Sequence, residues 1–398
     1  MKSVIAFSVM AILFLLSVTV LGHNASSQIA YAQTSSGAAT LSSDFNFAAA
    51  GDWGCKGETT ETVNNILDKN PELVLGLGDF SYGDDAGCWL EIVEPIDDIM
   101  KIAFGNEDLQ ASEETELMEH FGLTNQYYSF DYQNVHFTVM DDYLPDEIGS
   151  EQYIFVQNDL AKAAAAAPNI EWIVLVHHSQ KYASTKNYDI PEEREWNNIY
   201  HPLFEQYNVD LVVQGHQHNY QRTYPIKYNI DTPMNPIITD KNKSTYTNPE
   251  GQIFATVGTG GVNHHKLNGN KAPYTVIAQD EEFGFLNVDI INNNNINNDG
   301  TTALVGTFYA NDGGDKIIDQ FTITKSASGD SSPLPSPPPP LPPPELSVPE
   351  TDEVEEGDDE VVDDGLDDAV VSEDDEDVDA VAADDEQEEE ESDEGGGE

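Results

Sequence analysis

Short apolar runs recur through the first half of the chain, and most of them stop at a glycine, an aspartate or a histidine. Their length and their β-branched content are typical of strands that are buried on both faces of a sheet. The candidate strands of this region are 45–50, 73–77, 101–104, 135–140, 172–176 and 210–214.

Longer segments between these runs have the length and composition of helices. Pro71 and Pro168 end two of them, because proline lacks the amide hydrogen that an interior helical position donates. The alternation of strand and helix predicts an α/β core. The candidate helices are 59–70, 88–100, 150–167 and 192–207.

In the last part of the folded region, strand candidates follow one another without helices between them. This order predicts that the later strands form or extend a second sheet beside the α/β core. These candidates are 252–257, 283–290, 303–309 and 317–324.

The first 32 residues have the pattern of an export signal. Lys2 supplies a positive charge, residues 4–21 are almost wholly apolar, and residues 30–32 form a small-x-small cleavage candidate. An apolar run of this length is also at the lower limit for a membrane span. An uncleaved membrane anchor therefore remains the alternative.

Composition changes sharply at two points and sets the predicted domain limits. Residues 33–43 are small and polar and predict a linker to a folded domain at 44–325. Residues 326–349 are proline-rich and predict an extended spacer. Residues 350–398 contain no Lys or Arg and are dominated by Asp and Glu, which predicts a disordered tail. Its expected role is solvation, and weak contact with calcium or a surface protein is the alternative.

The formal net charge of −58 argues against two classes of partner. Nucleic acid and anionic membrane surfaces are themselves negative and would be repelled. The two cysteines, Cys55 and Cys88, suggest a disulfide in an exported chain, with free buried thiols as the alternative. We therefore expect a secreted or cell-surface protein.

Side chains that can bind metal follow several of the predicted strands. His216 and His218 are two residues apart, so an extended backbone would place both imidazoles on one face. Imidazoles that meet carboxylates at strand ends can hold divalent or trivalent ions. The candidates, in chain order, are Asp52, Asp79 with Tyr82, Asn106, His177, and His216 with His218.

Five blocks in this order resemble the signature of the metallophosphoesterase (calcineurin-like) superfamily, and of its purple acid phosphatase branch in particular. Residues 219–225 and 258–261 also resemble that branch. The resemblance covers about residues 45–324 and implies an α/β, four-layer sandwich of two mixed β-sheets flanked by helices. The five blocks are Gly51-Asp52-Trp53-Gly54, Gly78-Asp79-Phe80-Ser81-Tyr82, Gly105-Asn106-Glu107-Asp108, Val174-Leu175-Val176-His177 and Gly215-His216-Gln217-His218.

The resemblance implies two metal ions bridged by Asp79, since a carboxylate has two oxygens. Tyr82 is the residue that indicates the branch, and it would bind Fe(III) as a phenolate; packing beside Phe80 is its alternative. The second ion would be Fe, Zn or Mn. The other implied ligands are Asp52 and His218 at the first site, and Asn106, His177 and His216 at the second.

The chain departs from the family pattern on the substrate side. The family has a histidine directly after the third-block asparagine, where this chain has Glu107. An ionised Glu107 would repel a phosphate dianion, whereas a protonated Glu107 could donate a proton. His178 is the candidate substitute for the missing histidine, with a packing role as its alternative. Further candidates are Lys181, Lys186, His264 and His265.

We therefore expect an exported di-metal hydrolase of phosphate monoesters, similar to acid phosphatases, that attacks phosphorus with a metal-bound hydroxide. A phosphodiesterase on the same site is the second hypothesis, because a monoanionic diester tolerates Glu107 better than a dianion does. A catalytically impaired metal-binding surface protein is the third, suggested by the missing histidine and the acidic tail.

Overall fold

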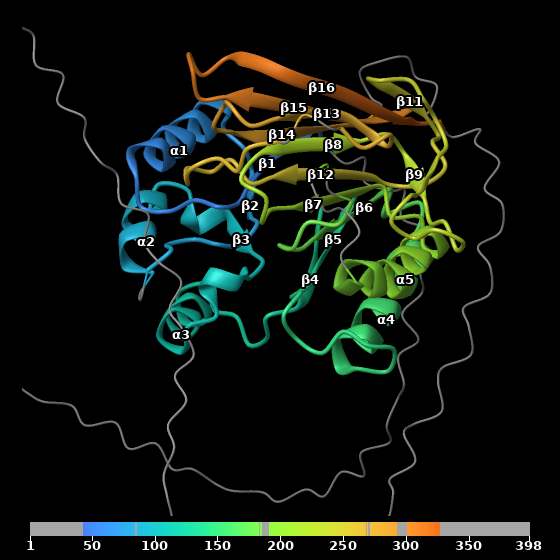
Figure 1. Ribbon diagram of the computed structural model, residues 1–398, viewed down its shortest axis with the longest axis horizontal. Coiled ribbons are helices and arrows are strands. Elements are labelled where there is room, and N and C mark those ends of the chain that lie inside the picture. The colour runs from blue at the N-terminus through green and yellow to red at the C-terminus, as the bar shows by residue number, and fades with distance from the viewer. Residues whose placement is uncertain are drawn as a thin grey trace, which may run out of the picture. The chain divides into compact units, whose positions relative to one another are not determined.

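Two mixed β-sheets packed face to face form the centre of the structure (Figure 1). The computed structural model describes residues 43–83, 86–182, 184, 191–267, 269, 271–292 and 301–326. The predicted export signal and acidic tail, and almost all of the linker and the proline-rich spacer, lie outside these residues. Within the described residues, no helix is long and apolar enough to span a membrane.

The first sheet combines a parallel and an antiparallel half. Its strands are β1 (Phe45–Ala50), β2 (Leu73–Gly76), β3 (Met100–Ile102), β11 (Thr245–Thr247), β14 (Gly284–Ile291), β15 (Thr302–Ala310) and β16 (Lys316–Lys325). Among the described residues they lie in the order β11–β16–β15–β14–β1–β2–β3. β1, β2 and β3 are parallel, and β14, β15 and β16 form antiparallel ladders on the other side of β1.

The second sheet has a parallel centre with antiparallel strands at its edges. Its strands are β4 (Tyr128–Tyr132), β5 (Val135–Val139), β6 (Trp172–Val176), β7 (Leu211–Gln214), β8 (Tyr220–Thr223), β12 (Ile253–Val257) and β13 (Thr275–Gln279). Their order in the described chain is β13–β8–β12–β7–β6–β5–β4, and β5, β6, β7 and β12 are parallel. The short strands β9 (Ile226–Lys227) and β10 (Ile237–Ile238) pair with each other.

Helices cover the outer faces of both sheets, so the predicted four-layer sandwich is confirmed (Figure 1). The helices α1 (Gly57–Lys69), α2 (Gly87–Val93) and α3 (Ala111–His120) pack on the first sheet. The helices α4 (Glu151–Ala165) and α5 (Pro191–Gln206) pack on the second sheet.

The alternation of side chains along β1 explains why the central strands are apolar throughout. Phe47 and Ala49 face the core between the sheets, whereas Ala48 and Ala50 face the helices on the outer side. Successive side chains of a strand point to opposite faces, and here both faces are covered. A continuous apolar run is the expected result.

The predicted elements mostly match the observed ones, with three differences. The helix predicted over 88–100 ends at Val93, because Pro95 cannot donate to a helical turn and disfavours helix before it. Of the later strand candidates, the one observed as β12 joins the second sheet as predicted, whereas those observed as β14, β15 and β16 return to the first sheet beside β1. The sequence also missed α3, β4, β8, β9, β10, β11 and β13.

The predicted cysteine pair is confirmed as a disulfide. Cys55 lies in the loop after β1, and Cys88 lies in the first turn of α2. Their Cα atoms are 5.9 Å apart, and 33 positions separate them in the sequence. The bond therefore ties α2 to the loop that follows Asp52.

Candidate metal centre

The candidate ligands lie in the loops that follow β1, β2, β3, β6 and β7, at the edge where these parallel strands end. Carboxylates from the loops of the first sheet meet imidazoles from the loops of the second sheet at this edge. Open α/β sheets bind ligands at the carboxyl ends of their strands. The two clusters therefore lie between the two sheets, at the ends of these strands.

The first cluster contains Asp52, Asp79 and His218, whose ligand atoms all lie within 4.8 Å of one another. His218 Nε2 lies 3.3 Å from Asp52 Oδ1. The hydroxyl of Tyr82 reaches into the same cluster, 2.9 Å from His218 Nε2 and 3.2 Å from Asp52 Oδ1. The four side chains expected at the first metal site thus converge.

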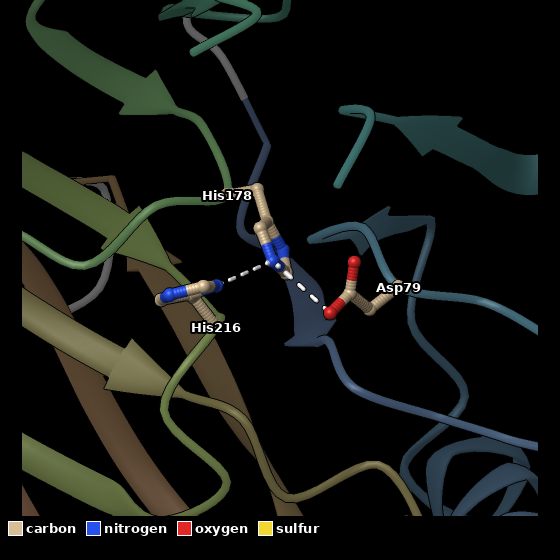
Figure 2. Close-up of side chains that lie close together, drawn as sticks. All are labelled: Asp79, His178 and His216. Carbon is tan, nitrogen blue, oxygen red and sulfur yellow. Dashed lines mark hydrogen bonds and ion pairs between the residues drawn. The ribbon is translucent and has the colours of Figure 1, made fainter. Parts of the chain in front are cut away.

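The second cluster contains Asp79, His178 and His216, again with ligand atoms within 4.8 Å of one another (Figure 2). His178 Nε2 lies 3.3 Å from Asp79 Oδ2 and 3.3 Å from His216 Nδ1. Asn106 Oδ1 lies 3.0 Å from His216 Nδ1, which places the amide oxygen at the same cluster. Asp79 belongs to both clusters and is therefore placed to bridge two ions.

Two of the imidazoles are held in the orientation that a metal requires. His178 Nδ1 donates to the carbonyl oxygen of Leu77 over 2.6 Å, and His218 Nδ1 donates to that of Asn263 over 2.8 Å. Because Nδ1 is occupied by the carbonyl, Nε2 is the nitrogen that faces the cluster in both residues, and it can bind a metal when it carries no proton. Together with the shared carboxylate, these donor sets fit two cations.

The ionisation of the clusters also favours positive charge at this place. Burial opposes protonation of His178, but its hydrogen bond to Asp79 and the charge of Asp79 outweigh burial and raise its pKa to about 10, so a metal ion bound there would displace the Nε2 proton. Burial, followed by the charges of Asp52 and Asp79, raises the pKa of Tyr82 above its ordinary value. The Tyr82 phenolate therefore needs a cation beside it, and the carboxylates attract one.

Buried groups around the ligands hold the loops in place. Asp108 is fully buried, and its carboxylate accepts the backbone N–H groups of Asp79, Phe80 and Gly105 over 2.7–2.8 Å. A Cβ on Gly105 would lie 2.2 Å from Asp79 Oδ1, so only glycine lets the carboxylate approach here. Asp108 stands in the third sequence block, but no role could be predicted for it before these contacts were known.

The expected ligand His177 lies outside both clusters, and the structure places His178 there instead. His177 Nδ1 donates to Asp142 Oδ2 over 3.0 Å, and its ring stacks on Trp196 of α5. The reason is alternation: Val176 faces the core between the sheets, so the next residue faces the helices and the one after faces back. His178 thereby becomes the candidate ligand, and its ring is not free to replace the missing family histidine.

The other substrate-side candidates have distinct positions. Glu107 is exposed, its backbone N–H donates to Asp79 Oδ1 over 2.9 Å, and its side chain accepts from the amide of Asn106. Lys181 is buried, with Nζ 3.3 Å from Asp142 Oδ1 and over the ring of Trp196, so it does not reach outward for phosphate.

Two histidines and one tyrosine complete the surroundings of the centre. His265 stacks on the ring of His218 with 3.7 Å between centroids, and His264 stacks on Phe283. Tyr143, which no sequence pattern indicated, donates its hydroxyl hydrogen to Asn106 Oδ1 over 3.2 Å. Lys186 lies outside the described residues.

Comparisons with known proteins agree with this geometry. A family model described as calcineurin-like phosphoesterase matches residues 45–220. Purple acid phosphatase 21 of Arabidopsis thaliana is 28% identical over 260 residues, covering 60% of this chain and 55% of that protein. Probable inactive purple acid phosphatase 1 of the same plant is 28% identical over 207 residues, covering 50% of this chain and 30% of that protein.

A solved structure shares the fold. Purple acid phosphatase PPD1 from yellow lupin (Lupinus luteus) seeds is 23% identical and gives a TM-score of 0.62, covering 72% of this chain and 55% of that one. The chain spans about half or less of the length of the curated relatives cited. Residues 45–220 thus match the calcineurin-like phosphoesterase family, and the chain is similar to purple acid phosphatases in sequence and in fold.

Proposed function

We propose that this protein is an exported phosphoric ester hydrolase with a di-metal centre, and that it acts on phosphate monoesters. The observation that carries the proposal is Asp79, a carboxylate shared by two adjacent ligand clusters. A shared carboxylate is what a pair of ions about 3.5–4 Å apart requires. The likeness to purple acid phosphatases supports the same reaction class.

The donor types suggest which ions the clusters would hold. The first ion would lie among Asp52, Asp79, Tyr82 and His218, where the phenolate favours Fe(III). The second would lie among Asp79, Asn106, His178 and His216, and would be Fe, Zn or Mn. Bound there, the ions would polarise a phosphoryl oxygen and lower the pKa of a bound water.

The chain's own contribution is to hold these donors still. The backbone N–H of Glu107 donates to Asp79 Oδ1, and the backbone N–H of His216 donates to Asp52 Oδ2, each over 2.9 Å. Leu77 and Asn263 fix the rings of two histidines through their carbonyl oxygens. Such preorganisation lowers the reorganisation needed when charge develops on phosphorus oxygens.

A phosphodiesterase is the second candidate, and the charge around the centre favours it. Glu107 is an exposed carboxylate beside Asn106, and Lys181 is occupied by Asp142. A dianionic monoester would be repelled more strongly by Glu107 than a monoanionic diester. One relative is named a probable inactive purple acid phosphatase. The test below therefore includes the possibility that this protein binds metal without hydrolysing an ester.

Export is supported by the Cys55–Cys88 disulfide, since disulfides persist in oxidising compartments. As part of the same proposal, the protein is secreted or held at the cell surface. The N-terminal apolar segment would then be a cleaved signal or an uncleaved membrane anchor. The acidic tail would remain solvated or contact calcium or a surface protein.

The test combines metal analysis, a visible spectrum and turnover on one purified sample of the full chain. We expect about two metal ions per chain including iron, a visible band lost in Tyr82→Phe, and hydrolysis of nitrophenyl phosphate. The bis-nitrophenyl ester, assayed alongside, separates monoesterase from diesterase by the ratio of rates.

Asp79→Asn is the decisive variant, because it alters the ligand common to both clusters. Turnover that survives this substitution would refute the di-metal proposal. Two bound metals without turnover on either ester would identify the protein as an impaired member of the superfamily.

A further inference from the structure

Tyr143 lies beside the second cluster and is partly open to solvent. Its hydroxyl donates to Asn106 Oδ1 over 3.2 Å, and its ring centroid is 6.3 Å from that of His178. The residue is 37% exposed, so its ring borders solvent on one side and the cluster on the other.

The backbone that leads into Tyr143 is anchored through the two residues that precede it. Asp141 holds the backbone N–H of Tyr143 over 2.7 Å and is itself held by Gln152 through two hydrogen bonds of 2.8 Å. Asp142, the next residue, accepts from the backbone N–H groups of His178 and Ser179. The hydroxyl of Tyr143 is therefore presented from a fixed position.

A phosphoryl group bound here needs a hydrogen-bond donor, and the charged candidates do not supply one. Glu107 is a carboxylate, and the Lys181 ammonium is turned toward Asp142. The amide N–H of Asn106 already donates to Glu107 over 2.7 Å. A neutral hydroxyl can donate to a phosphoryl oxygen without adding charge to the site.

The hydroxyl of Tyr143 has one hydrogen to donate, and it can exchange one acceptor for another. A protonated phenol retains the hydrogen that a donor requires. The contact to Asn106 is a neutral hydrogen bond, which is weaker than one to a charged phosphoryl oxygen.

We propose that Tyr143 contacts the substrate, exchanging its hydrogen bond to Asn106 for one to a non-bridging oxygen of a phosphoryl group at the Asp79–His178–His216 cluster. Tyr143 thus stabilises charge on the phosphoryl oxygens, the role that the histidine has in the family at the position occupied here by Glu107. This inference rests on the proposed function, because it names a residue that binds the substrate class of the same site.

The test is Tyr143→Phe in the metal-loaded full chain, which removes the hydroxyl and keeps the ring. We expect unchanged metal content and melting temperature. The dissociation constant for inorganic phosphate should rise, and kcat/KM should fall, each by about 10- to 100-fold, the range for one hydrogen bond to a charged group. Calorimetric titration with inorganic phosphate measures the first, and nitrophenyl phosphate hydrolysis the second.

Tyr127→Phe is the matched control. Tyr127 is half-buried, and its ring packs against Phe155 rather than beside a candidate ligand. The same loss of a hydroxyl at this position should leave phosphate affinity, kcat/KM and metal content unchanged.

Two results with Tyr143→Phe would overturn the inference. If metal content falls and excess metal restores the rate, the hydroxyl serves only to orient Asn106. If phosphate affinity and kcat/KM are unchanged, Tyr143 makes no contact with the substrate.

The proposed function and the role of Tyr143 can fail separately. A wild-type protein that hydrolyses no ester refutes the proposed function, while its phosphate affinity, compared with that of Tyr143→Phe, still decides the role of Tyr143. Metal-loaded wild-type protein that binds no phosphate would refute both.

Discussion

Four candidate ligands have a backbone conformation that L-residues rarely adopt. The φ angles are positive at Asp52 (59°), Asp79 (54°), Tyr82 (56°) and His216 (69°). Each such residue costs on the order of 1–2 kcal/mol and persists only where neighbouring interactions enforce it. The carboxylate of Asp108, which binds two N–H groups of the loop after β2, is one such interaction. Placing these ligands therefore lowers the free energy of unfolding, because the strained backbone is present only in the folded state.

The adjacent histidines that follow β6, His177 and His178, give a direct test at the residue scale. His178→Asn should lower metal content from about two ions to about one and reduce kcat/KM by more than about 100-fold, because a ligand is lost. His177→Asn should keep both ions, since His177 binds Asp142 and lies outside both clusters. Metal analysis and steady-state kinetics on the two variants measure the difference.

The opposite result would contradict this assignment. If His177→Asn lost an ion and His178→Asn kept both, the ligand would be the residue that the sequence motif suggested. Melting temperature serves as the check that both variants are folded.

At the scale of elements, hydrophobic patterning located most strands and helices but not all of them. The strand β8 is buried along its whole length although it contains Gln221 and Arg222, so its burial has no apolar signature. The helix α3 buries only Glu113 and Leu117 completely, which leaves a weak pattern. Polar residues that are buried with partners cannot be recognised before the partners are known.

One contact among elements predicts a dependence of stability on pH. His136 of β5 lies between Asp131 of β4 and Asp159 of α4, at 2.6 and 2.9 Å. Burial opposes the charged imidazolium, but the hydrogen bonds to Asp159 and Asp131 outweigh it and raise the pKa of His136. A raised folded-state pKa stabilises the fold below the unfolded value of about 6.5, and the effect is lost as pH rises through the folded pKa.

We therefore expect His136→Gln to lower the free energy of unfolding more at pH 5.5 than at pH 8.5, as measured by urea denaturation. His120→Gln removes a more exposed pair with Asp97 and is the control, with a smaller effect because solvent screens such pairs. An equal loss at both pH values would show that His136 contributes packing rather than charge.

At the scale of the whole molecule, a buried ion pair joins the two sheets. Arg222 of β8 donates to Asp319 of β16 over 2.5 and 2.9 Å, and the Arg222 side chain is fully buried. Tyr220 donates to the same carboxylate over 2.8 Å. The pair bridges sheets whose interface is otherwise formed by apolar side chains.

Asp319→Asn should destabilise the protein by about 3–5 kcal/mol, because it leaves the Arg222 charge buried without a counter-charge. Replacing both partners with apolar residues, Arg222→Met with Asp319→Leu, should cost less than the single change. Urea denaturation of the three variants measures these costs, with metal content as a check on the centre. A double variant less stable than Asp319→Asn would contradict the argument.

The sequence by itself determined the α/β class, most strand ends, the disulfide pair and the residue types of the metal centre. These depend on local patterns: apolar runs, glycines before ligands, and two histidines spaced for one face of a strand. Only the tertiary structure decided between His177 and His178, because β6 is apolar on both faces and its pattern does not say which face meets the other sheet. It likewise decided that β14, β15 and β16 return to the first sheet and that Tyr143 borders the centre, since both follow from contacts between segments far apart in the chain.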